Sequence, residues 1–167
     1  YYGMGHNAVV DNVKWGYFEQ NSDQIAVYNT LLYPEELGKN GLVNVSTKSL
    51  PLENVQDNGV SAMELNIQDN SSNVTTNGVY YLVHDRDQIA YRNVGDYMTN
   101  AGMTYVEQRN GRVHNIAFQE GSVLLNQAGV PYITSTAPIS DLGVQYESNT
   151  MELASSDAAL DLDALTI

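Results

Sequence analysis

Two aspartates, Asp85 and Asp87, stand two residues apart directly after the apolar run VYYLVH. Carboxylate oxygens on alternate residues of a loop are typical Ca²⁺ ligands, so Asp85 and Asp87 are candidate calcium ligands. Asp69 in QDNSSN and the pair Asp161 and Asp163 mark two further acidic turns. None of these segments has the spacing of an EF-hand loop, so the alternative for each is a solvated turn. Calcium is the one cofactor that the sequence suggests.

The residues that could catalyse a reaction form no recognisable set. The histidines His6, His84 and His114 have no second His at metal-ligand spacing, and the Gly-x-Ser-x-Gly elbow is missing. No cysteine is present to act as a nucleophile. Paired carboxylates could serve glycoside hydrolysis, but nothing in the sequence selects a pair. The candidates are Glu35, Glu64, Glu107 and Glu120. We therefore expect no catalytic residue and no enzymatic activity.

The composition limits the partners of this chain. It has 20 acidic and 7 basic residues, a net charge of −13, and its basic residues are scattered. Phosphate contacts require clustered Lys and Arg, so we expect no nucleic-acid binding. The same charge disfavours anionic membrane surfaces, and no apolar run is long enough to insert into a membrane. Only 16% of residues are charged, and the abundance of Asn, Gln, Ser and Thr favours a virion or extracellular location.

The dipeptide Asn-Gly occurs four times and is the strongest local signal of the sequence. Asn and Gly tolerate the positive φ angles that a two-residue type I′ hairpin turn requires. The pattern predicts hairpins at Asn58–Gly59, Asn77–Gly78 and Asn110–Gly111. At Asn40–Gly41 the preceding segment PEELGK favours a short helical turn with a glycine cap instead.

The segments around these turns have strand-like patterns. Residues 60–68 alternate, with Met63, Leu65 and Ile67 on one face and polar residues on the other. The run LVNVSTKSL after Gly41 alternates in part, and a strand precedes each predicted hairpin turn, including LENVQ before Asn58. Further strands are expected at 12–20, 24–33, 123–127, 130–138 and 143–148. One helix is expected at 93–102, where apolar residues fall at helical spacing.

Many short strands separated by turns predict a mainly β fold. We expect an antiparallel β-sandwich, jelly roll or barrel with one or two short helices. Residues 1–150 are expected to form a single β-rich domain. Residues 151–167 are expected to form an acidic C-terminal arm or a short helix, with Ser155 or Ser156 as its N-cap.

These features favour a structural role. We expect a subunit of a virion (a capsid, decoration or tail component) or of an extracellular surface filament, whose partners are copies of itself or other structural subunits. Such a subunit would assemble through β-sheet contacts and terminal arms. The alternatives are a secreted carbohydrate-binding module and a small hydrolase. Because the chain begins YYGMGHN rather than with Met, we expect that a leader was removed or that another segment precedes it.

Overall fold

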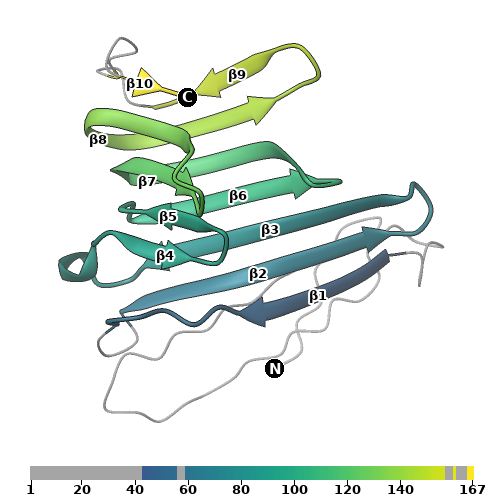
Figure 1. Cartoon of the computed structure of the whole chain (residues 1–167), viewed down its shortest axis with the longest axis horizontal. Coiled ribbons are helices and arrows are strands. Elements are labelled where there is room, and N and C mark those ends of the chain that lie inside the picture. The colour runs from purple at the N-terminus through teal and green to yellow at the C-terminus, as the bar shows by residue number, and fades with distance from the viewer. Residues whose placement is uncertain (1–42, 56–58, 157–159, 161–164) are drawn as a thin grey trace, which may run out of the picture.

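The computed structural model describes residues 43–55, 59–156, 160 and 165–167 (Figure 1). The described residues form ten strands and one 3₁₀ turn, and the predicted mainly β, antiparallel fold is confirmed. The strands are β1 Val43–Ser49, β2 Val60–Asp69, β3 Val74–Val83, β4 Arg92–Val94, β5 Tyr97–Thr99, β6 Met103–Arg109, β7 Arg112–Asn126, β8 Pro131–Tyr146, β9 Met151–Ala154 and β10 Leu165–Thr166. The 3₁₀ turn, η1, covers Arg86–Gln88.

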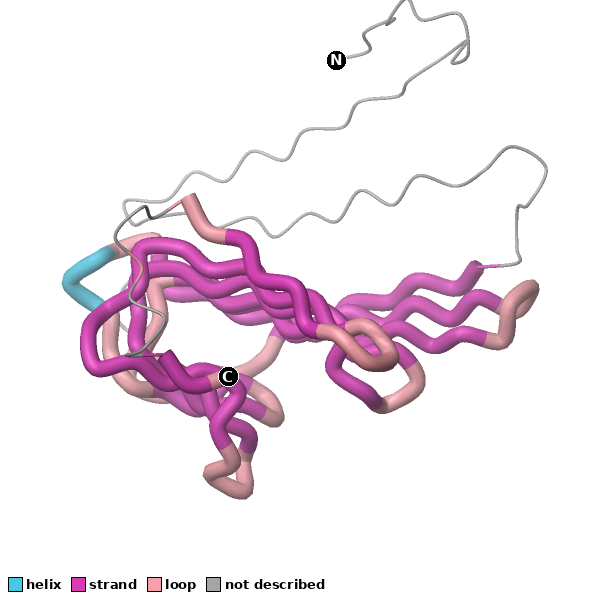
Figure 2. Tube along the Cα trace, turned by 90° about the horizontal axis from the view of Figure 1, so that it is seen from above, coloured by secondary structure: helices cyan, strands magenta, loops and turns pink. Residues whose placement is uncertain are grey.

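The ten strands belong to one sheet. Its main path runs β1-β2-β3-β6-β7-β5-β4, while β8 pairs with β7, β9 and β10. The sheet is not closed into a barrel. Figure 2 shows that it curls over at one end, so that two parts of the same sheet face each other like the layers of a sandwich.

The long strand β7 joins these two parts. Its first part pairs with β6 and its last part with β5. Between them Glu120 has a φ of 54°, a left-handed conformation that residues with a Cβ rarely adopt. The side-chain oxygen of Asn100 accepts hydrogen bonds from the backbone N–H groups of Ser122 and Val123, each at 2.9 Å. The amide of Asn100 therefore satisfies backbone groups that the bend removes from the ladder.

Two apolar clusters form the core. The larger lies between the facing parts of the sheet, and the smaller lies where β2 and β3 meet β4. Buried members of the larger cluster are Tyr97, Ala101, Val106, Ile116, Phe118, Leu124, Ile133, Ile139, Leu142 and Val144. Those of the smaller cluster are Val60, Ala62, Tyr81, Val83 and Val94. The alternating side chains of the strands thus bury one face of each part of the sheet.

The hairpin predicted at Asn110–Gly111 is confirmed. Arg109 of β6 pairs with Arg112 of β7, which leaves Asn110 and Gly111 as the two turn residues. Their φ angles are 50° and 77°, as a type I′ turn requires. The strands predicted at 60–68, 123–127, 130–138 and within 143–148 also form. The predictions for 12–20, 24–33, Asn40–Gly41 and the helical turn before it lie outside the described residues.

The hairpin turn predicted at Asn77–Gly78 is wrong, because β3 runs straight through both residues. The chain turns earlier, between β2 and β3, where Asn73 has a φ of 56°. Within β3, Asn77 accepts a hydrogen bond from Asn66 at 2.6 Å, and the ring of Tyr105 lies over Gly78. Cross-strand contacts therefore outweigh the local turn preference of the dipeptide.

The strand predicted at LENVQ before Asn58 is wrong over residues 52–55, and residues 56–58 lie outside the described part. Leu52 and Val55 instead pack as loop residues against the smaller cluster. β2 takes its partners from β1 and β3. A short apolar run before a glycine therefore anchored a loop instead of forming a strand.

The helix predicted at 93–102 is also wrong. Residues 93–99 belong to the β4–β5 hairpin, in which Val94 pairs with Tyr97 across the turn residues Gly95 and Asp96, and residues 100–102 connect β5 to β6. Gly95 has a φ of 55°. Residues three apart share a side both in a helix and across a two-residue turn, so the apolar spacing did not distinguish the two structures.

The C-terminal segment begins with a strand. β9 pairs with β8, and the hydroxyl groups of Ser155 and Ser156 donate to the backbone carbonyl and the carboxylate of Asp141. Leu165 and Thr166 pair with Ser135 and Thr134 of β8. Residues 157–159 and 161–164, where the predicted helix would begin, lie outside the described part.

Candidate functional site

Within the described part of the chain, β1 is the last strand on one side of the sheet (Figure 1). It pairs with β2 without a bulge, from Val43 opposite Asp69 to Ser49 opposite Met63. Six of its seven residues are exposed. Proteins commonly protect an edge strand with Pro, bulges or several charges, and β1 has only Lys48. Among the described residues, β1 is therefore a regular and poorly protected edge.

Alternate residues of β1 direct their backbone groups away from β2. The N–H of Leu50, the residue after β1, donates to the carbonyl of Ala62 on β2 at 3.0 Å. Because hydrogen-bonded and non-bonded pairs alternate in an antiparallel ladder, the even-numbered residues of β1 bond to β2. The odd-numbered residues Val45, Thr47 and Ser49 consequently direct their N–H and C=O groups toward the open edge.

The other long path through the sheet ends at β9, all four residues of which are exposed. Five large apolar side chains of the described residues are exposed, and three of them lie on these two edge strands. Val45 of β1 is 39% exposed, and Met151 and Leu153 of β9 are 44% and 40% exposed. The accessible apolar side chains therefore concentrate on the two edges.

The sequence predicts a strand after Gly41 but not its position at the edge of the sheet. The signal that indicates an edge is polarity on both faces in the second half of the strand, where residues 46, 47, 48 and 49 are all polar. A strand covered on one face would alternate apolar and polar residues. This two-sided polarity matches the exposure of β1 on both faces.

Asp85 and Asp87, the candidate calcium ligands, lie at the start of η1. The carboxylate of Asp85 caps this turn, accepting from the backbone N–H of Asp87 at 3.1 Å and from the side chain of Gln88 at 3.3 Å. No group of three or more His, Asp or Glu side chains that could hold a metal occurs among the described residues. A calcium site here remains a prediction from the sequence.

Asp69 forms the turn between β2 and β3. Its carboxylate accepts hydrogen bonds from the hydroxyl and backbone N–H of Ser71 and from the hydroxyl of Ser72. These bonds lower the pKa of Asp69 to about 2, the Ser71 hydroxyl contributing most. The segment QDNSSN is thus a hydrogen-bonded turn. Asp161 and Asp163 lie outside the described residues.

One contact resembles part of a hydrolase site. The hydroxyl of Ser61 lies 2.9 Å from Nε2 of His84. A Ser–His pair needs a third group to orient the imidazole, and no described carboxylate bonds to the His84 ring. Ser61 is only 8% exposed. His114 lies near Arg109, 3.3 Å from its guanidinium, and His6 lies outside the described residues.

The carboxylates named for glycoside hydrolysis are not brought together. Glu64 pairs with Val79 and Glu107 with Gly78, and since adjacent residues of a strand point to opposite faces, these two carboxylates lie on opposite sides of the sheet. Glu107 binds Arg109 at 2.9 Å, and Glu120 forms an ion pair with Arg86. Glu35 lies outside the described residues.

Comparisons with known proteins identify no relative. No family model matches the chain, and neither a curated protein nor a solved structure matches it. In the part of the chain that the structure describes, no helix has the length and apolar character needed to cross a membrane.

Proposed function

We propose that this protein is a structural subunit that assembles with copies of itself by strand addition at β1. The observation that carries the proposal is the regular, exposed edge of β1, which has one charge and no bulge. An edge of this kind is a template for another strand, and main-chain hydrogen bonds supply the affinity. The setting is a virion, as a capsid, decoration or tail component, or an extracellular surface filament.

The shape of the sheet supports a head-to-tail contact between copies. Following the pairings from β1 through β2, β3, β6, β7 and β8 leads to β9. The two edges are different surfaces, so pairing β1 of one copy with β9 of the next is a heterologous contact. Contacts of this type produce closed rings or open filaments, depending on the rotation between neighbours. Both assemblies are compatible with a virion or filament subunit.

Charge on the two edges is compatible with this contact, whereas total charge opposes it. β1 carries Lys48 and β9 carries Glu152, which have opposite signs. A net charge of −13 makes whole copies repel each other. The screening length falls from about 30 Å at 0.01 M salt to about 10 Å at 0.1 M. Assembly is therefore expected to increase with ionic strength.

The carbohydrate-binding and hydrolase alternatives have weaker support. A sugar-stacking platform needs exposed aromatic faces, but Tyr81 and Tyr97 are 0% and 3% exposed, and the pair Tyr80 and Tyr105 is half-buried. Tyr91 is 53% exposed, and among the described residues it is the only large aromatic side chain with that degree of exposure. The Ser61–His84 contact supports a hydrolase only in part, because no described carboxylate bonds to the His84 ring and Ser61 is buried.

Replacing Thr47 with Pro tests the proposed edge. Thr47→Pro removes an N–H that faces the open edge and leaves the β1–β2 ladder intact, whereas Thr47→Ala keeps that N–H. Light scattering and negative-stain imaging at increasing salt should show large assemblies for the native chain and for Thr47→Ala, and loss of assembly for Thr47→Pro. Thermal unfolding of the three proteins should be similar, because proline is tolerated where an edge N–H faces solvent.

A second variant keeps the test decisive if Thr47→Pro fails to fold. Val45→Glu retains the backbone but adds a negative charge to the edge, and it should weaken assembly by repulsion between acidic copies. A native chain that stays monomeric at high concentration and high salt would refute the proposal. So would assembly of folded Thr47→Pro and Val45→Glu at the native level.

A further inference from the structure

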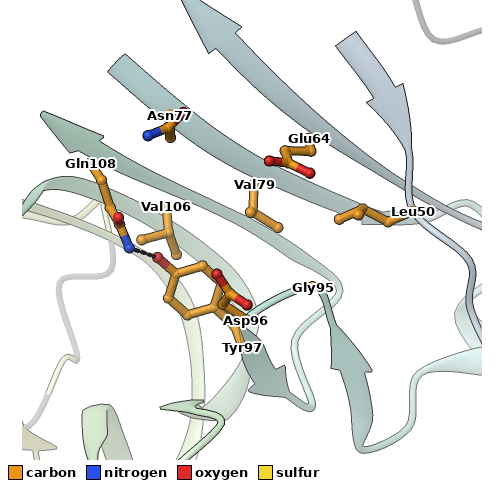
Figure 3. A pocket seen from close by; sticks show the side chains of 9 residues that line it. All are labelled: Leu50, Glu64, Asn77, Val79, Gly95, Asp96, Tyr97, Val106 and Gln108. Carbon is orange, nitrogen blue, oxygen red and sulfur yellow. Dashed lines mark hydrogen bonds between the residues drawn. The ribbon is translucent and has the colours of Figure 1, made fainter. Parts of the chain in front are cut away.

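A cavity of about 200 Å³ lies under the turn between β4 and β5, against the face of β2, β3 and β6 that bears Val106 (Figure 3). Pockets for drug-sized ligands have volumes of about 300 to 1,000 Å³, so this one suits a smaller molecule. Its polar groups are two carboxylates, two carboxamides and one phenol. They belong to Glu64, Asp96, Asn77, Gln108 and Tyr97.

The register of the sheet places most of these groups side by side. Glu64 lies opposite Val79, which lies opposite Val106, and this row crosses β2, β3 and β6. Asn77 lies opposite Gln108 in the next row on the same face. The sheet therefore presents an aliphatic strip bordered by one carboxylate and two carboxamides (Figure 3).

The β4–β5 hairpin supplies the other two polar groups. Asp96 is exposed at the turn, and Tyr97 is only 3% exposed. The side-chain nitrogen of Gln108 donates to the Tyr97 hydroxyl at 2.7 Å. Burial raises the pKa of Tyr97 to about 12, and the charge of Asp96 acts in the same direction. The phenol thus keeps its proton, which is available as a donor to a ligand.

The hydrogen-bonding capacity of this cavity is only partly used. The carboxylates of Glu64 and Asp96 make no hydrogen bond or ion pair with a described residue. The side-chain oxygen of Asn77 accepts a hydrogen bond from Asn66. The side-chain N–H groups of Asn77 have no acceptor among the described residues. Gln108 donates to Tyr97 and leaves its oxygen as an acceptor. The cavity therefore offers several acceptors, two of them negatively charged, and a smaller number of donors.

These groups determine the chemistry of a ligand. No Lys or Arg lines the cavity, and Lys48, which lies opposite Glu64 in register, is exposed and forms no ion pair with it. A neutral ligand would displace water from the carboxylates without compensating their charge, which is costly. An ammonium group compensates that charge through strong charge-assisted hydrogen bonds. The donors on Asn77 and Tyr97 require acceptor oxygens on the same molecule.

We propose that this cavity binds a small organic ammonium ion that also carries hydroxyl groups, such as an amino sugar or an amino alcohol. The ammonium group lies between Glu64 and Asp96, and hydroxyl oxygens accept from Asn77 and Tyr97. The carbon skeleton packs on Val79. This binding does not depend on assembly at β1.

Three methyl glycosides test the proposal on the full chain by ¹H–¹⁵N NMR titration. Methyl glucosaminide is the cation, and methyl glucoside has the same ring without the charge. The N-acetyl derivative of the glucosaminide has the nitrogen but no charge. The glucosaminide should shift the signals of Asp96 and of the Asn77 and Gln108 side chains, and should bind about tenfold more tightly than either neutral compound. Nα-Acetyl-lysine amide has the charged ammonium group of a lysine side chain but no hydroxyl groups. It should therefore bind more weakly than the glucosaminide, which distinguishes a lysine side chain from a free hydroxylated amine.

Two near-isosteric variants and one control locate the site. Glu64→Gln and Asp96→Asn should each weaken glucosaminide binding about tenfold, because each removes one charged acceptor. Glu147→Gln changes the net charge equally in an exposed turn away from the cavity and should bind like the native chain. The proposal is overturned if the glucosaminide does not bind, if the neutral glucoside or acetyl-lysine amide binds as tightly, or if Glu64→Gln and Asp96→Asn behave like Glu147→Gln.

Discussion

Two glycine-to-alanine substitutions, Gly111→Ala and Gly143→Ala, isolate the free energy of the β6–β7 turn. Gly111 has a φ of 77°, and a Cβ built on it has no neighbour within 4 Å. Gly143 lies in β8 without a positive φ, and its Cβ would meet Ala154 at 3.6 and 3.8 Å, which is ordinary contact. Neither substitution creates a steric clash. The largest difference between the two sites is the backbone conformation, so the difference in stability reports mainly the left-handed turn.

The expected magnitudes follow from these geometries. A left-handed residue with a Cβ costs about 1 to 2 kcal/mol relative to glycine. Both substitutions also reduce the entropy of the unfolded chain, which stabilises by about 0.4 to 1 kcal/mol. Gly111→Ala should therefore lower the free energy of unfolding by about 1 kcal/mol, and Gly143→Ala should leave it unchanged or raise it slightly. The unfolded-state contribution cancels in the difference, which should be about 1 to 2 kcal/mol.

Urea denaturation at low salt, where copies repel each other, measures both variants. At this chain length 1 kcal/mol corresponds to roughly 2 to 4 °C in Tm, so thermal unfolding provides a second readout. The slope of the urea transition should not change, because neither residue alters the surface exposed on unfolding. Equal stability of the two variants would refute the assignment of a left-handed turn at Asn110–Gly111.

Two further predictions concern Asp69 and Glu120. The Ser71 and Ser72 hydrogen bonds lower the pKa of Asp69 to about 2, so they stabilise the fold above the unfolded pKa of about 4, and this contribution is lost as pH falls toward 2. Asp69→Asn should flatten this part of the stability profile in acid denaturation, and a native profile in the variant would contradict the assignment. Glu120→Gly relieves a φ of 54° and removes the ion pair with Arg86 and the packing of the Glu120 side chain beside Gly102, so stability by urea denaturation should stay equal or rise by up to about 1 kcal/mol. A clear loss would show that the ion pair or the side chain matters more than the backbone conformation.

Local turn chemistry explains both the successes and the errors of sequence analysis here. Asn110–Gly111 turned as predicted because strand residues on both sides pair directly across it. Asn77–Gly78 has the same residues but lies in the middle of β3, where Tyr105 covers Gly78. A dipeptide preference of about 1 kcal/mol is easily exceeded by the pairing of two ten-residue strands. The same local signal therefore has different outcomes in different registers.

The proposed ligand cavity could not be found from sequence. In the sequence, Glu64 is one of four candidate carboxylates for glycoside hydrolysis, and nothing selects it from the others. Asp96 and Tyr97 fall within a segment that predicts a helix. Asn77 belongs to a dipeptide that predicts a turn. The cavity forms because β2, β3 and β6 come into register and the β4–β5 hairpin lies over them. Such long-range pairings leave no periodic pattern along the chain.

By itself, the sequence determined that this chain builds antiparallel strands and sharp turns. The alternation of apolar and polar residues and the tolerance of Asn and Gly for positive φ angles are both properties of residues that are close in the sequence. It also determined an acidic chain without cysteine chemistry. The tertiary structure alone decided which strand lies at the edge, where the sheet curls and which polar side chains meet in a cavity. Those properties arise from the register between distant segments, and a one-residue shift in that register would turn the opposite face of a strand to each neighbour.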